Sequence, residues 1–182
     1  MSLKLKNQYC DKAGLINILE EIVNAIHEDY SHNEPLVFIG ILEGGSKIVD
    51  YLARRLGELK NTTFPVTYLD ITLYRDDVID AAGDPYHKTT EIPFAVKGKE
   101  IILVDDVLFT GRTARAALSA ILANGRPKRV KLAAVIDRGF RELPIHADYV
   151  GRTIQTTRHQ GVRVRTHDSQ SEPGIYIYEE EV

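Results

Sequence analysis

The sequence predicts an α/β fold in which helices cover both faces of a mostly parallel sheet. Short apolar strands alternate with amphipathic helices along the 182 residues, and parallel strands require helical crossovers of this kind. The strands are apolar throughout, which is typical of strands buried on both faces. Ligands of such folds bind at the carboxyl ends of the strands, so a functional site is expected at that edge.

The first half of the chain supplies two helices on either side of one buried strand. Apolar residues between positions 15 and 26 recur at the i, i+3, i+4, i+7 spacing of an amphipathic helix, and Asp11 stands where its cap is expected. Residues 36–42 form a continuous apolar run that ends at a Glu-Gly-Gly turn. A second helix follows, and one side of it consists of Ile48, Leu52 and Leu56.

The second half adds further strands and a helix. Residues 101–104 and 130–136 are apolar and predict two buried strands, and a late strand is expected at residues 175–178. Gly125 stands where the helix between the first two is expected to end. The predicted apolar face of this helix consists of Ala114, Ala117, Leu118, Ile121 and Leu122.

A long polar segment interrupts this pattern. Residues 66–74 are rich in β-branched and aromatic side chains and predict a strand, whereas residues 75–91 contain glycine, proline and charges without periodicity. A structureless connection of this length exceeds the usual ~12–15 residues, which favours a flexible functional lid over a passive link.

Composition and charge narrow the classes of function. The net charge of −3, from 23 basic and 26 acidic residues, gives no overall field that attracts nucleic acid or anionic lipid. Cys10 is the only cysteine, and no stretch approaches the ~20 apolar residues of a membrane span. We therefore expect a single domain over residues 1–182 that works in the reducing cytoplasm and has no membrane partner.

The segment of residues 101–113 joins an apolar strand to a helix through two acids and a hydroxyl-rich turn. Backbone N–H groups between Thr110 and Thr113 lie at a helix start, where they are unpaired and the helix dipole favours an anion such as phosphate. Gly111 removes the Cβ that would block close approach to this backbone. The turn therefore predicts a phosphate site.

The two acids, Asp105 and Asp106, stand directly after the apolar strand. Adjacent carboxylates can accept hydrogen bonds from neighbouring ribose hydroxyls and stabilise positive charge that develops at C1 of the sugar. Together with the turn they would hold both ends of a ribose phosphate. The alternative is that both acids only cap the following helix and that Thr-Gly is a plain turn.

This segment resembles the PRPP motif of the type I phosphoribosyltransferases, where PRPP is 5-phosphoribosyl-1-pyrophosphate. The resemblance implies the fold of that family, with a small hood region near the C-terminus, and a homo-oligomer. It places the ribose hydroxyls on Asp105 and Asp106, with Mg²⁺ brought in by PRPP as the only metal expected near them. The residues implied to bind the 5′-phosphate are Thr110, Gly111, Arg112 and Thr113.

Two further segments match that family. Glu43, Gly44 and Gly45 follow the first buried strand, where the family has its pyrophosphate loop, and the glycines let backbone N–H groups approach an anion. The resemblance also implies that the lid closes over PRPP and that Arg75 places positive charge beside the departing pyrophosphate. The alternatives are a plain turn at the glycines and a solvated ion pair of Arg75 with a neighbouring aspartate.

The chain from about residue 36 to residue 157 resembles the bacterial PyrR proteins. This resemblance implies transfer of ribose 5-phosphate from PRPP to uracil, which gives UMP and pyrophosphate. It also implies that backbone groups near Tyr149 and Val150 read the base, although these residues can equally form the end of a core strand. PyrR proteins also bind the leader RNA of pyrimidine genes when UMP is present.

Three features of the sequence bear on the substrate and on RNA binding. The Glu-Gly-Gly turn lacks the arginine that is usual in the pyrophosphate loop of PyrR, which removes one positive charge from the anion site. Phe109 stands where hypoxanthine-guanine enzymes carry an aspartate that handles a purine proton, and PyrR commonly has an aromatic residue there, which favours a pyrimidine. No Lys or Arg occurs from Ala13 to Tyr30 in the first helix, and Phe140 and His146 stand where histidine and arginine are usual.

These losses predict weak RNA binding, because RNA affinity depends heavily on phosphate contacts. The leading hypothesis is a uracil phosphoribosyltransferase, ahead of a PyrR-type RNA-binding attenuator with little catalysis and of a purine phosphoribosyltransferase. The remaining candidates for contact with RNA are Arg141, Arg152, Arg158, Arg163 and Arg165.

Overall fold

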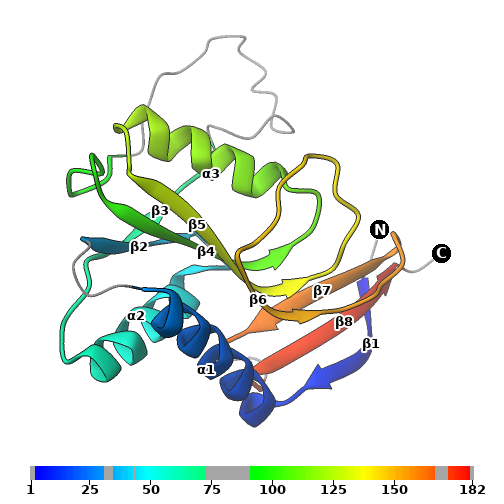
Figure 1. Ribbon diagram of the computed structural model, residues 1–182. Helices are drawn as coiled ribbons and strands as arrows, with labels where there is room; N and C mark the ends of the chain where they lie inside the picture. The colour runs from blue at the N-terminus through cyan, green and yellow to red at the C-terminus, as the bar shows by residue number, and fades with distance from the viewer. Residues whose placement is uncertain (1–2, 31–34, 43, 73–90, 167–171, 181–182) are drawn as a thin grey trace, which may run out of the picture.

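The protein folds as a five-stranded parallel sheet with helices on both faces and a smaller antiparallel sheet beside it (Figure 1). The computed structural model describes residues 3–30, 35–42, 44–72, 91–166 and 172–180. The strand order is β3-β2-β4-β5-β6 in the large sheet and β1-β8-β7 in the small one, which we call the hood sheet. The elements are β1 Leu3–Cys10, α1 Lys12–Asp29, β2 Leu36–Ile41, α2 Ser46–Lys60, β3 Val66–Leu69, β4 Glu100–Leu108, α3 Arg112–Ala123, β5 Arg129–Asp137, β6 Tyr149–Thr153, β7 Gln160–Arg165 and β8 Gly174–Glu180.

The predicted α/β architecture is confirmed, with one apolar cluster on each face of the large sheet. Helices α1 and α2 cover one face and α3 covers the other (Figure 1). Phe38 and Ile39 are adjacent on β2, belong to opposite clusters and are both 0% exposed. Because both faces of the central strands are covered, an apolar side chain is favourable at every position, which explains the continuous apolar runs.

Helices α1 and α2 follow the sequence pattern closely. The Asp11 side chain accepts a hydrogen bond from the Gly14 N–H (2.9 Å), so the predicted cap is confirmed. The residues of α1 that lie in the core are Leu15, Ile18, Leu19, Ile22, Val23 and Ile26. The three predicted core residues of α2 are each fully buried.

Helix α3 packs through a different face than predicted. Leu122 is 58% exposed, whereas Ala116 and Ala120 are fully buried. A face of alanines lets the helix backbone lie close to the sheet, and burial of Leu122 would require a different helix rotation. The apolar face predicted for this helix was therefore partly wrong, although Ala114, Ala117 and Ile121 are buried as expected.

Two strands also differ from the sequence pattern. Strand β3 ends at Leu69, earlier than the predicted strand over residues 66–74. Strand β1 was not predicted, and it pairs with β8 from the opposite end of the chain. Among the described residues, no helix combines the length and apolar character that a membrane span requires.

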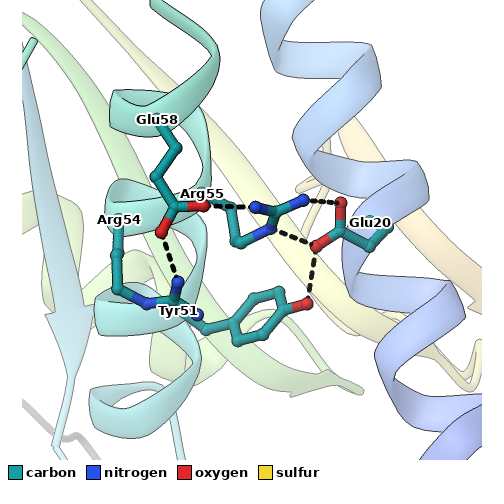
Figure 2. Close-up of polar contacts among 5 residues, drawn as sticks. All are labelled: Glu20, Tyr51, Arg54, Arg55 and Glu58. Carbon is teal, nitrogen blue, oxygen red and sulfur yellow. Dashed lines mark hydrogen bonds and ion pairs between the residues drawn. The ribbon is translucent and has the colours of Figure 1, made fainter. Parts of the chain in front are cut away.

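A polar network fastens α1 to α2 on the outside of the molecule (Figure 2). The Glu20 carboxylate accepts hydrogen bonds from the Tyr51 hydroxyl (2.6 Å) and from Nε of Arg55 (2.6 Å). Arg55 also pairs with Glu58, whose other oxygen lies 2.5 Å from the Arg54 guanidinium. The hydrogen bond from Arg55 is the main reason why the pKa of Glu20 lies below its ordinary value.

We expect Glu20→Gln to lower the midpoint of thermal unfolding by about 2–4 °C at pH 7. A carboxylate with a lowered pKa in the folded state stabilises the fold above its unfolded pKa, and this contribution is lost as pH falls through the folded pKa. The difference from the unsubstituted protein should therefore shrink as pH falls below the ordinary glutamate pKa of ~4.3 and disappear below the lower folded pKa. Glu28→Gln, at an exposed position of the same helix, is the control, and an equal loss there would contradict the expectation.

Candidate active site

A cavity of about 630 Å³ opens at the carboxyl ends of β2, β3 and β4 and is bounded on one side by the hood strand β7. This is the edge of the parallel sheet at which ligands of α/β folds bind. Its walls come from segments far apart in the sequence. The residues that line it are Ile41, Leu42, Gly44, Asp70, Ile71, Thr72, Asp105, Asp106, Val107, Thr113, Arg163, Val164 and Arg165.

Asp105 and Asp106 lie near the carboxyl end of β4, the central strand of the sheet. The Asp105 side chain is 5% exposed and accepts a hydrogen bond from the Asp106 N–H (3.0 Å). The Asp106 side chain accepts one from the Val107 N–H (2.8 Å). Both carboxylates line the cavity, and the two side chains lie close enough to interact with each other.

The acidic pair is held in an environment that favours its neutral form. Burial, together with the neighbouring charge of Asp106, raises the pKa of Asp105 to about 8, and burial also raises the pKa of Asp106. Within the described residues, no cation contributes to either shift. Buried carboxylates in this state have unused capacity for hydroxyl donors or for a cation.

The chemistry of this pair fits Mg²⁺. Mg²⁺ takes oxygen ligands and is commonly held by one or two protein carboxylates together with substrate phosphates. No group of three or more acidic, His or Cys side chains in the described part of the chain could hold a metal by itself. Asp105 and Asp106 are the residues that would hold such an ion together with a phosphorylated ligand.

The turn from Thr110 to Thr113 leads into α3 and lies beside the cavity, which Thr113 lines. Gly111 is the cap residue and has a left-handed backbone with φ +91°, a conformation that favours glycine. The first helical bond runs from the Arg115 N–H to the Gly111 carbonyl (2.9 Å), so the amides before Arg115 point out of the helix. The Thr110 hydroxyl accepts a hydrogen bond from the Arg112 N–H (3.3 Å).

A brace of residues after β5 fixes this turn. The carbonyl of Thr110 accepts hydrogen bonds from the N–H groups of Glu142 (2.9 Å) and Leu143 (3.1 Å). The Glu142 carboxylate pairs with Nε of Arg112 at 2.7 Å. Arg141, which is 15% exposed, donates to the Phe109 carbonyl (2.6 Å) and pairs with Asp137 (2.5 Å). The turn predicted to bind phosphate is thus held in place by the residues that follow β5.

Gly44 and Gly45 bring the end of β2 against the acidic pair. A Cβ on Gly44 would lie 2.4 Å from Oδ1 of Asp106. One on Gly45 would lie 2.3 Å from the backbone oxygen of Val104. Only glycine allows this approach, which sets the backbone before α2 directly beside Asp106.

The residues expected near the base lie outside the cavity lining just described. The Tyr149 hydroxyl donates to Asp29 of α1 (2.5 Å), and burial raises the pKa of Tyr149. Val150 is 38% exposed on β6, the edge strand of the large sheet. The Phe109 ring has the Arg138 guanidinium 3.9 Å from its centroid and meets the Phe140 ring edge to face.

The structure thus brings Gly44, Asp105, Asp106 and Thr113 around one cavity, with the Thr110 turn fixed beside it. Glu43 and Arg75 lie outside the described residues, and their predicted roles stay predictions. Sequence reasoning gave no active-site role to four polar residues of the lining, of which Arg163 and Arg165 were considered only for contact with RNA. Asp70 and Thr72 could have been found because they lie toward the carboxyl end of the predicted strand over residues 66–74, whereas the positions of Arg163 and Arg165 depend on the hood sheet.

Comparison with known proteins identifies the family of the chain. The phosphoribosyl transferase domain family matches residues 7–168. The Bifunctional protein PyrR of Pelotomaculum thermopropionicum is 46% identical over 96% of each chain. That of Thermus aquaticus is 41% identical over 98% of this chain and 99% of its own.

Solved structures resemble the fold at much lower identity. A hypoxanthine phosphoribosyltransferase of Trypanosoma cruzi has a TM-score of 0.72 at 18% identity, over 97% of this chain and 98% of its own. One from Staphylococcus aureus has a TM-score of 0.71 at 19% identity, over 94% of this chain and 90% of its own. These two likenesses show the fold alone. Domain match and sequence identity together show that the chain belongs to the type I phosphoribosyltransferases and, within them, to the family of the bifunctional PyrR proteins.

Proposed function

We propose that the protein transfers ribose 5-phosphate from PRPP to uracil and so produces UMP and pyrophosphate. The observation that carries the proposal is the acidic pair of β4, in which Asp105 is buried and Asp106 is half-buried. The pair shares one cavity with Gly44 and with Thr113, which belongs to the turn predicted to bind phosphate. Membership of the PyrR family supports a phosphoribosyltransferase. We also propose that residues 1–182 form a single domain, that the protein is a homo-oligomer, and that it works in the cytoplasm.

In the proposed reaction the bond from ribose C1 to the diphosphate oxygen breaks and a bond from C1 to uracil N1 forms. The uracil N1 proton leaves, and the diphosphate departs with the bonding electrons. The turn at Thr110, Gly111, Arg112 and Thr113 would hold the 5′-phosphate through backbone amides and hydroxyls. Asp105 and Asp106 would accept hydrogen bonds from the ribose hydroxyls and stabilise the positive charge that develops at C1.

Mg²⁺ would be held near the acidic pair by carboxylate and PRPP oxygens, and it would supply positive charge to the leaving diphosphate. The backbone amides of Gly44 and Gly45 would face the same diphosphate, with Glu43 in the loop before them. Arg75 would add positive charge from the lid. A closed lid would exclude the water that could otherwise capture the reacting sugar.

The residues beside the turn support a pyrimidine as the acceptor. Phe109 has no acid or base with which to handle a purine ring proton, and it packs against Arg138 and Phe140 instead. Because β6 is an edge strand, one side of its backbone lies outside the sheet ladder. Backbone groups around Val150, after Tyr149, would read the uracil edge.

The alternative function, an RNA-binding attenuator, is less well supported by the candidate arginines. Arg141 braces the turn through backbone carbonyls and Asp137. Arg152 donates to both carboxylate oxygens of Glu21 on α1. Two of the five candidate arginines are thus engaged within the protein, which lowers the RNA affinity expected from the set. Nanomolar, hairpin-specific binding of leader RNA with a steep salt dependence would favour the regulator instead.

The proposed function is tested by incubating the protein with PRPP, Mg²⁺ and one base at a time: uracil, hypoxanthine, guanine or orotate. We expect UMP to form fastest, with equimolar pyrophosphate. Omission of Mg²⁺ is the first control, and omission of the base measures hydrolysis of PRPP. Faster turnover with hypoxanthine or guanine than with uracil would replace the proposal with the purine hypothesis.

A further inference from the structure

Two arginines of the hood sheet line the cavity opposite the acidic pair. Arg163 and Arg165 are two positions apart on β7, so their side chains leave the same face of that strand. Both line the cavity that Asp105 and Asp106 also line. The cavity therefore has an acidic wall on β4 and a basic wall on β7.

Tyrosines of the neighbouring strand β8 hold both guanidinium groups. Arg165 donates to the Tyr178 hydroxyl (2.6 Å) and lies 5.0 Å from the centroid of the Tyr176 ring. Arg163 lies 5.1 Å from the centroid of the Tyr178 ring. Both tyrosines are 7% exposed, so they form a fixed platform for the arginines.

This mode of support leaves the positive charges available to a ligand. A guanidinium on an aromatic face is oriented without being neutralised, and it keeps most of its five N–H donors for other acceptors. In the described part of the chain, neither arginine forms an ion pair with a carboxylate. Other arginines at the large sheet are neutralised, since Arg112, Arg141 and Arg152 each pair with an acid.

The position of the basic wall indicates which part of PRPP it would contact. Its two arginines share the cavity with Leu42 and Gly44, which lie between β2 and α2, and with Thr72 after β3. Thr113 of the 5′-phosphate turn also lines the cavity. The shared lining with the glycine turn after β2, which the diphosphate would face, is what favours the diphosphate as the group that the arginines contact.

We propose that Arg163 and Arg165 bind the diphosphate of PRPP and of the pyrophosphate product. This inference rests on the proposed function and deepens it. Planar guanidinium groups bind phosphate oxygens through paired, charge-assisted hydrogen bonds. The two arginines supply, from the far side of the cavity, the positive charge that the glycine turn after β2 lacks.

The test compares Arg163→Gln, Arg165→Gln and the double variant with the unsubstituted protein. Glutamine keeps hydrogen-bond donors but removes the charge. Lys6→Gln is the control, because Lys6 lies on β1, at the opposite edge of the hood sheet from β7, and pairs with Glu179 of β8. The measurements are calorimetric titration with inorganic pyrophosphate and Mg²⁺, KM for PRPP, KM for uracil, and thermal unfolding.

Each single variant should raise Kd for pyrophosphate and KM for PRPP by roughly tenfold or more, the loss expected for one charge-assisted contact. KM for uracil and the unfolding midpoint should stay within the range of the Lys6→Gln control. Unchanged pyrophosphate affinity in an active, folded variant would overturn the inference. Absence of nucleotide synthesis by the unsubstituted protein would instead refute the proposed function, and the pyrophosphate titration would still decide whether the two arginines bind that anion.

Discussion

Asp105→Asn and Asp106→Asn are each expected to lower kcat/KM for PRPP at least a hundredfold, the usual magnitude for a group that stabilises developing charge. Asparagine keeps the volume of the side chain, so the loss would come from the charge and not from packing. The measurement is initial velocity at saturating uracil, with circular dichroism as the check on folding. Full activity in both variants would mean that the two acids only shape the turn.

Asp105→Asn should also stabilise the fold, and this effect should depend on pH. The pKa of Asp105 is about 8 in the folded protein and ~3.9 in an unfolded chain. Between these values the unfolded state loses a proton that the folded state keeps, so the free energy of unfolding falls as pH rises through this window. The variant lacks this penalty and should be more stable by on the order of 1–3 kcal/mol at pH 8, with no gain at pH 4.

Such a result would separate catalysis from stability at one residue. A variant that is less active and more stable is expected where a buried charge is kept for a ligand. A variant that loses stability at pH 8 would instead indicate that the Asp105 carboxylate makes essential contacts within the fold.

Gly45→Ala is expected to destabilise the protein by ~3 kcal/mol or more. The new methyl group would lie 2.3 Å from the Val104 carbonyl and 2.9 Å from two backbone atoms of Ile41. These atoms belong to β2 and β4 in the middle of the sheet, so they cannot move away without breaking its hydrogen bonds. Chemical denaturation monitored by circular dichroism measures the loss.

Two other glycines provide the comparison. Gly44→Ala would meet the Asp106 carboxylate, a side chain that can rotate, so activity should fall more than stability. Gly161→Ala on β7 meets no atom within 4 Å and should change stability by less than ~0.5 kcal/mol. Equal stability losses in all three variants would contradict a steric origin of the effect.

Local patterns predicted the sheet and the acidic pair because both depend on neighbours in the sequence. The apolar run of β4, the two acids and the Thr-Gly turn are contiguous, and their positions in the fold follow from one strand and one helix. The rotation of α3 about its axis could not be predicted from neighbouring residues in the sequence. Hydrophobicity favours burial of Leu122, but the closeness that Ala116 and Ala120 permit between helix and sheet decided the face.

Sequence reasoning predicted one strand of the hood sheet, at residues 175–178, but not its pairing with β1 and β7, for a related reason. In β1, Lys4 and Lys6 alternate with less polar residues, and the strand is exposed over most of its length. Nothing in that pattern indicates that β1 pairs with β8, with Leu3 opposite Glu180. The roles of Arg163 and Arg165 depend on that pairing, since β8 carries the tyrosines beneath them.

The pairing of β1 with β8 also sets the order in which a newly made chain can assemble its cavity. Strand β1 comes before all the other described strands in the chain and its partner β8 comes after them, so β1 must wait until every strand of the large sheet has been synthesised. Closing so long a loop has an entropic cost and slows folding relative to local contacts. The large sheet can thus form before the hood, and the basic wall of the cavity is completed only after β8 has been synthesised.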